Sequence, residues 1–116
     1  MPYVEVRTNV SATDEARDAL LDALVTTTAS HLAKPEEVTM AHLGAAEAFR
    51  FKGESAPTAF VSIRAIGLPD VDARKALVAS VSALLASSLG VPSDRAFIVF
   101  DDVPRDRWGV RGTILG

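Results

Sequence analysis

The sequence repeats itself with a shift of 57 residues, and this internal similarity limits the possible folds more than any other feature. Ten positions coincide under that shift without a gap. The coinciding pairs are Val4 and Val61, Arg7 and Arg64, Ala16 and Ala73, Arg17 and Arg74, Ala19 and Ala76, Leu20 and Leu77, Ala29 and Ala86, Ser30 and Ser87, Leu32 and Leu89, and Pro35 and Pro92. We therefore interpret residues 1–116 as a single domain with two related units, residues 2–43 and 59–100, and a C-terminal tail, residues 101–116.

Each unit has the pattern of a strand, a helix and a second strand. The strands show alternation of apolar and polar residues, and the helices show an apolar stripe, which is Ala16, Ala19, Leu20, Ala23, Leu24 and Thr27 in the first unit. The first helix is capped by Ser11 or Thr13 and ends before Pro35. The other expected elements are strands at 3–8, 38–43, 59–66 and 96–100, and a helix from about 70 to 89.

This order of elements predicts an α/β (α+β) fold with one mixed sheet. A crossover through a helix makes the two strands of a unit parallel, so two units give a four-stranded sheet with both helices on one face. The other face then lacks a cover within the chain, although its strands carry Tyr3, Phe60 and Phe97. An apolar face without a partner predicts self-assembly.

Composition excludes several classes of function. The chain has a net charge of −3 and no basic block, so nucleic acid is not an expected partner. It has no cysteine, which excludes disulfides and thiol chemistry, and its two histidines are too few for a metal cluster. We find neither a signal peptide nor a stretch that predicts a membrane span, so we expect no membrane partner and a cytoplasmic location.

The opening "MPYVEVRTNV" places a proline at the first residue of a strand. If Met1 is removed, Pro2 carries a free secondary amine. An α-amino group has an ordinary pKa near ~8, and both desolvation and a neighbouring cation lower that value. Such an amine is suited to remove a proton next to a carbonyl group and to return it to a neighbouring carbon. The alternative is that Met1 stays, in which case the Pro2 nitrogen is an amide without basicity.

Several motifs together resemble the tautomerase superfamily, in particular its macrophage migration inhibitory factor and D-dopachrome tautomerase branch. The resemblance covers almost the whole chain, from Met1 to about Leu115. The motifs that carry it are the Met-Pro opening, "KPEEV", "FKGESAP", "SIRAIG", "DRAFI" and the tail "WGVRGTIL". The resemblance implies a homotrimer whose three sheets enclose a channel, which would cover the open face.

The resemblance also implies a cofactor-independent keto–enol tautomerase that acts on a small keto acid or its enol, of the phenylpyruvate or dopachrome type. Pro2 is then the general base and acid, and no cofactor or metal is expected. Lys34 would hold a substrate carboxylate or carbonyl and lower the pKa of the Pro2 amine, while the backbone N–H of Ile66 adds a second anchor. The remaining candidates for substrate binding are Tyr3, Arg64 and Phe97.

Two of these candidates have simpler interpretations. Lys34 follows a helix, where a cation favours the helix dipole, although the second unit has Val91 at that position. Arg64 corresponds to Arg7 of the first unit and could be a solvated charge on a strand.

The chain also departs from the branch. Phe97 and Val99 stand where the branch has a tyrosine and an asparagine, Val38 replaces a tyrosine, and residues 58–61 lack the Cys-x-x-Cys motif. Two alternatives to a tautomerase therefore stay open. One is a binding or signalling homologue with a weak or vestigial site, and the other is a hydratase or dehalogenase of unsaturated acids.

Overall fold

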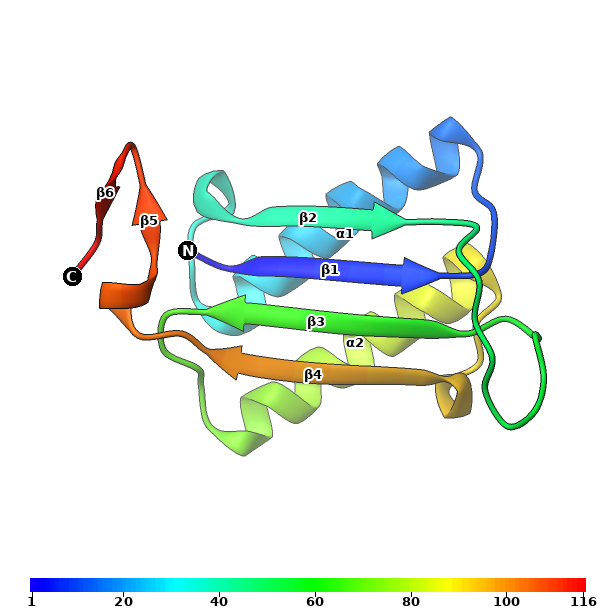
Figure 1. The fold of residues 1–116 in the computed structure, drawn as a ribbon. Coiled ribbons are helices and arrows are strands. Elements are labelled where there is room, and N and C mark those ends of the chain that lie inside the picture. Colours follow the sequence, from blue (N-terminus) through cyan, green and yellow to red (C-terminus); the bar gives the residue numbers. More distant parts are fainter.

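The computed structural model describes residues 1–116, and it contains the two units expected from the internal repeat (Figure 1). The first unit comprises β1 (Tyr3–Thr8), α1 (Asp14–Leu32) and β2 (Met40–Gly44). The second comprises β3 (Ala59–Ala65), α2 (Val71–Leu89) and β4 (Ala96–Asp102). A short 3-10 helix precedes the second strand of each unit, at Glu36–Val38 and Ser93–Arg95.

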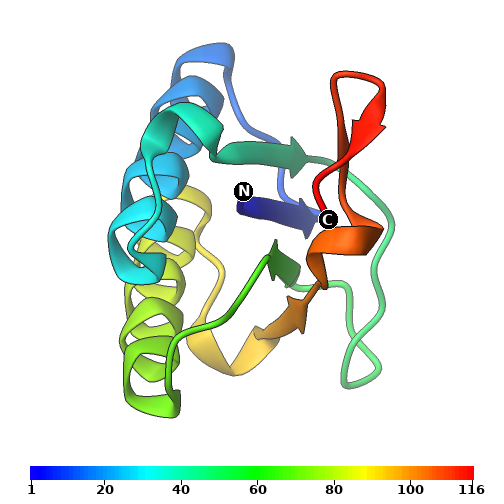
Figure 2. The ribbon, with the colours of Figure 1, turned by 90° about the vertical axis from the view of Figure 1, so that its left-hand side faces the viewer.

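The four strands form one mixed sheet in the order β2-β1-β3-β4. Within each unit the two strands are parallel, whereas β1 and β3 are antiparallel and join the units, with Tyr3 opposite Arg64 and Thr8 opposite Ala59. Both helices cover the same face of the sheet, as Figures 1 and 2 show. The predicted fold class is therefore confirmed.

Both helices begin at a side-chain cap and end at a residue with left-handed backbone geometry. Of the two cap candidates for α1 the structure selects Thr13, whose hydroxyl oxygen accepts from the N–H of Ala16 at 3.1 Å. In α2 the carboxylate of Asp70 accepts from the N–H of Ala73 at 2.9 Å, so Asp70 precedes the helix. The helices end at Ala33, with φ 54°, and at Gly90, with φ 67°. These ends fix where the chain turns back toward the sheet.

The core lies between the helices and the sheet. From the sheet it takes Val4, Val6, Val61 and Ile63, and all four are fully buried. Each helix buries residues spaced by four positions, which are Leu20, Leu24, Thr28 and Leu32 in α1 and Leu77, Val81, Leu85 and Leu89 in α2. The predicted stripe of α1 is correct at positions 20 and 24 and wrong at Ala19, which is exposed. The reason is that the buried row of α1 recurs every four residues from Leu20 to Leu32, and Ala19 lies outside that row.

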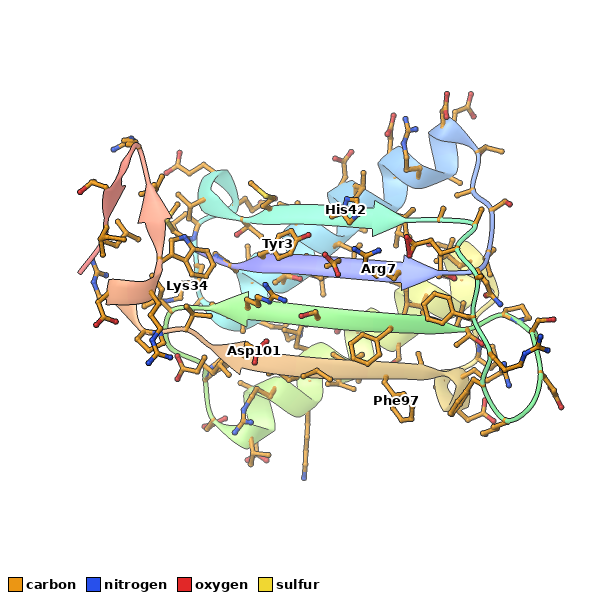
Figure 3. The ribbon with its side chains drawn as sticks, in the orientation of Figure 1. Tyr3, Arg7, Lys34, His42, Phe97 and Asp101 are labelled. Atoms are coloured by element: carbon orange, nitrogen blue, oxygen red, sulfur yellow. The ribbon has the colours of Figure 1, made fainter.

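The face of the sheet opposite the helices is more polar than predicted. Phe60, Phe97 and Val99 are exposed on it, but the same face carries ion pairs (Figure 3). Arg7 contacts Glu5 at 3.0 Å and Glu47 at 2.9 Å, and Arg64 lies 3.7 Å from Asp101. The prediction of an apolar face was wrong because it counted the aromatic residues of this face and left out the charged residues that lie on the same face.

Four strand boundaries differ from the sequence-based prediction, and one of them is the end of β2, which lies at Gly44 and not at residue 43. Val38 belongs to a 3-10 helix, so β2 starts two residues later than predicted, at Met40. Strand β3 ends at Ala65, one residue earlier than predicted. Strand β4 continues beyond Phe100 to Asp102, because its last residue still pairs with Ala65 of β3.

The C-terminal tail has its own structure, which the sequence analysis did not predict. It forms a 3-10 helix (Arg105–Arg107) and a hairpin of β5 (Gly109–Val110) and β6 (Thr113–Ile114). Arg111 and Gly112, which connect these strands, both have positive φ, as a tight two-residue turn of this kind requires. Figures 1 and 2 show the hairpin beside the N-terminus, on the side of the sheet that the helices leave open. No helix in the structure has both the length and the apolar character that a membrane span needs.

Candidate active site

A pocket of about 470 Å³ lies at the end of the sheet where β1 begins. Met1, Pro2 and Tyr3 line it from the start of the chain, and two apolar side chains are added by Val38, from the 3-10 helix before β2, and by Met40, the first residue of β2. No Asp or Glu lines the pocket. Its size is in the range of pockets that take small organic ligands.

Pro2 is held in a fixed place at the bottom of this pocket. It is buried, and its carbonyl oxygen accepts a hydrogen bond from the backbone N–H of Met40 at 3.0 Å. Because proline has no N–H to donate, the position before the first ladder residue suits it. The amine of Met1, which is one residue farther out, has its pKa lowered from 8.0, mainly by burial and then by the charges of Lys34 and Arg105. The start of the chain therefore lies in surroundings that favour a neutral amine.

Lys34 and Ile66 meet beside the N-terminus, through the carbonyl oxygen of Ile66 and not through its N–H. Lys34 follows the left-handed residue Ala33 that ends α1, and its Nζ donates to the carbonyl oxygen of Ile66 at 3.1 Å. This bond holds the ammonium group close enough to affect the amine electrostatically. Neither residue lines the pocket wall itself, so Lys34 acts on the pocket from its edge.

Tyr3 and Arg64 line the pocket from neighbouring strands. The hydroxyl of Tyr3 donates to Glu5 at 2.9 Å, and burial together with this bond raises the pKa of Tyr3. The hydroxyl group is therefore uncharged at neutral pH. Arg64 is half exposed, and its only ion-pair partner is Asp101 at 3.7 Å. Its guanidinium therefore keeps donors available to a ligand.

The C-terminal tail adds a wall to the pocket, whereas the sequence left two roles open for Trp108, a cover over the pocket or a contact between subunits. Arg107, Trp108 and Val110 line the pocket beside Pro2. Two backbone hydrogen bonds fix Trp108. Its N–H donates to the carbonyl oxygen of Arg105, and its carbonyl oxygen accepts from the N–H of Leu115. The signal that could have revealed this arrangement is the Arg-Gly turn at 111–112, which folds the hairpin back.

Phe97 does not belong to this pocket within one chain. It lies at the opposite end of the sheet from Tyr3 and Lys34 (Figure 3). There its ring packs edge-on against Phe51 with centroids 5.3 Å apart. Phe60, Phe97 and Arg95 are among the residues that line a second cavity at this end, of about 200 Å³.

Arg95 organises the loop at this second end. It is 7% exposed, and its guanidinium donates to the carbonyl oxygens of Pro57 at 3.0 Å and Phe51 at 3.2 Å, and to the hydroxyl of Thr58 at 2.8 Å. Longer contacts reach Ala56 and Glu54. The resemblance motif "FKGESAP" is thus a loop folded around one arginine.

Comparison with known proteins identifies the family. The family model described as Macrophage migration inhibitory factor (MIF) matches residues 1–116. The chain belongs to the macrophage migration inhibitory factor family. Among curated proteins it is 27% identical to a macrophage migration inhibitory factor homologue from Brugia malayi over the full length of both chains. It is 30% identical to the homologue from Trichinella spiralis, with 97% of this chain and 98% of the relative covered.

Solved structures of the macrophage migration inhibitory factor family have the same fold. The homologue from Prochlorococcus marinus superposes with a TM-score of 0.92 at 32% identity, covering 98% of this chain and 99% of that chain. The macrophage migration inhibitory factor of Toxoplasma gondii gives a TM-score of 0.91 at 28% identity, with 97% and 98% covered. The superfamily assignment made from the sequence motifs is confirmed. The structure of this family member contains no group of three or more His, Asp or Glu side chains that could hold a metal ion.

Proposed function

We propose that this protein is a cofactor-independent tautomerase of small keto acids, and that Pro2 is its general base and acid. The observation that carries this proposal is the position of Pro2, which is buried at the bottom of a pocket with cationic side chains and without acidic ones. Removal of Met1 would expose the Pro2 amine at this place. A homologue with a binding or signalling role needs no such amine.

The surroundings of Pro2 support a basic, neutral amine at neutral pH. Burial and the charges of Lys34 and Arg105 already lower the pKa of the Met1 amine, which is only half-buried. Pro2 is more deeply buried, so desolvation acts more strongly on an amine placed there. A general base works best when its pKa lies near the pH of the reaction.

The proposed reaction needs only the Pro2 amine and a cation. The amine takes a proton from the carbon next to the ketone, and the electrons of that C–H bond form the C=C bond of the enolate. Negative charge then develops on the carbonyl oxygen, where Lys34 stabilises it. The ammonium of Pro2 returns the proton to oxygen through solvent or to the neighbouring carbon, and the sequence runs equally in reverse.

The pocket lining favours a tautomerase over a hydratase or dehalogenase. Those reactions add water to an unsaturated acid and need a carboxylate to activate it. Asp101 is the carboxylate paired with Arg64, and neither it nor any other acid lines the pocket. Proton transfer at carbon requires no such group.

The proposal is tested by hydrogen–deuterium exchange at C3 of a 2-oxo acid, followed by proton NMR in D2O. Intact mass spectrometry first separates protein without Met1 from protein that retains it. We expect exchange with the processed protein alone, because the Pro2 nitrogen is an amide when Met1 stays. Equal exchange by both forms, or exchange by neither, would refute the proposal.

We also propose a homotrimer, which the family resemblance and the open sheet face support. Phe97 and Val99 are exposed on that face, and contact between subunits would bury them. Light scattering at micromolar concentration should give three times the chain mass of 12.3 kDa. A monomer mass would contradict this assembly.

A further inference from the structure

The tail brings a second arginine to the Pro2 pocket, and the side chain of this arginine has no partner within the chain. Arg107 lines the pocket together with Arg64, and its guanidinium makes no hydrogen bond or ion pair. Arg64 makes no side-chain hydrogen bond, and its one ion pair, with Asp101, is long. Arg95, in contrast, uses its donors on five protein acceptors. Two guanidinium groups in the pocket lining therefore have N–H donors that no protein acceptor uses.

The charge around the pocket is opposite to the charge of the whole protein. The chain has a net charge of −3, yet Arg64 and Arg107 line the pocket and Lys34 lies at its edge. No carboxylate lines the pocket, and the one acidic partner of these cations is Asp101, which lies outside the lining at 3.7 Å from Arg64. A cluster of one sign in a concave site raises the local concentration of ligands of the opposite sign.

One carboxylate does not account for all three cations. A 2-oxo monoacid carries a single negative charge, which Lys34 at the edge of the pocket can neutralise. An arginine binds a carboxylate through two parallel N–H···O bonds, and two guanidinium groups with free donors favour a further anionic group on the ligand. Val103, Trp108 and Val110 line the same pocket with apolar side chains, which suits a short hydrocarbon chain.

We infer that the Pro2 pocket selects dicarboxylates, such that one carboxylate of a 2-oxo diacid or its enol lies near Lys34 and the second is bound by Arg107 with Arg64. This inference rests on the proposed function because it takes the same pocket as the substrate site. It adds the substrate class, and it makes Arg107 a specificity-determining residue contributed by the tail.

Binding of unreactive acids tests this inference without any need for turnover. Trp108 is the only tryptophan and lines the pocket, so its fluorescence reports on occupancy. Glutarate and pentanoate have the same number of carbons but differ by one carboxylate. We expect glutarate to bind about tenfold more tightly or better, which is the range of a hydrogen-bonded contact to a charged group.

Two variants separate specific recognition from general attraction. Arg107→Gln should lower the affinity for glutarate about tenfold and change that for pentanoate by less than ~3-fold. Arg111→Gln is the matched control, because it removes an equal charge from the same C-terminal tail at a residue that does not line this pocket. It should change neither affinity. Equal binding of the two acids, an equal loss of both in Arg107→Gln, or an equal effect of both variants would overturn the inference.

Failure of the dicarboxylate inference can be distinguished from failure of the tautomerase proposal. If glutarate is preferred and depends on Arg107, but no 2-oxo acid undergoes exchange, the tautomerase proposal fails and the dicarboxylate site stands. If 2-oxopentanoate and 2-oxoglutarate exchange equally well and glutarate has no advantage in binding, the tautomerase stands and the dicarboxylate inference fails.

Discussion

Arg95 holds the loop of residues 51–57 in place, so its loss should destabilise the folded state strongly, and Arg95→Met tests this. Methionine keeps much of the side-chain volume but removes the guanidinium. The change would leave three acceptors at 3.2 Å or less, on Phe51, Pro57 and Thr58, without their donor. Arg95 is almost fully buried, so water does not simply take its place.

The magnitude follows from these contacts. A hydrogen bond to a charged group contributes about 1.5–3 kcal/mol, but two of the three short bonds share one nitrogen, so they are not additive. A buried acceptor left without its donor costs about 1–3 kcal/mol, and because three acceptors are affected without full additivity, we expect a loss of about 3–5 kcal/mol of unfolding free energy. At roughly 4 °C for each kcal/mol, the melting temperature should fall by about 12–20 °C.

The assay is urea or thermal unfolding followed by circular dichroism, with Arg50→Met as the matched control. Arg50 lines the same cavity but is exposed and makes no hydrogen bond, so its replacement should change the unfolding free energy by less than ~0.5 kcal/mol. If Arg95→Met lost less than ~1 kcal/mol, the view that this arginine holds the loop together would be refuted.

Three further predictions concern the pocket and the open face of the sheet. Pro2→Ala, with Met1 removed, should keep the fold and lower the rate of C3 exchange by about 10²–10⁴-fold, and full activity would contradict the role of Pro2. In the processed protein, activity should rise with pH through an amine pKa that burial and Lys34 lower from its ordinary value; Lys34→Ala should move that midpoint upward, and an unchanged pH–rate profile would refute the role of Lys34. The pKa of Glu5 is lowered by the Tyr3 hydroxyl and then by Arg7, so its contribution to stability is present above pH 4.5 and lost as the pH falls through the lowered pKa. Denaturation of Glu5→Gln from neutral to acidic pH should therefore show a deficit at neutral pH that disappears in acid, whereas a deficit independent of pH would argue against this linkage.

Much of the fold could be predicted because the alternation of apolar and polar residues along a strand depends only on neighbours in the sequence. The internal repeat then shows the same order of elements twice. The bounds of β1 were predicted correctly, and Val4 and Val6 lie in the core as their alternation implies. The stripe of α1 was only partly correct because the face that a helix buries depends on its neighbour, and α2 is far away in the sequence. The exposed Ala19 shows that helical periodicity in the sequence does not by itself decide which residues of a helix are buried.

The residues of the candidate site likewise fall into those that the sequence could predict and those that it could not. Pro2, Tyr3 and Arg64 lie together because the register of β1 and β3 places their ends side by side. Arg107 and Trp108 were not assigned to the pocket, since their place depends on the turn at 111–112 and not on any pattern of polar and apolar residues. Phe97 was grouped with Pro2 by resemblance alone, and the topology of a single chain separates them.

The antiparallel contact of the two units gives the molecule an approximate twofold symmetry with two equivalent ends. The shift of 57 residues relates Pro2 to Ala59, Tyr3 to Phe60, Val38 to Arg95, and Met40 to Phe97. The first member of each pair lines the large pocket, and the second lines the small cavity at the other end. The symmetry is broken where the chain passes through Thr58 into Ala59, because a peptide bond replaces the terminus there. Only one of the two equivalent ends of the sheet lies where β1 begins, so a terminal amine can form at that end alone. At the other end the equivalent position is inside the chain, and Arg95 holds the loop together there by hydrogen bonds.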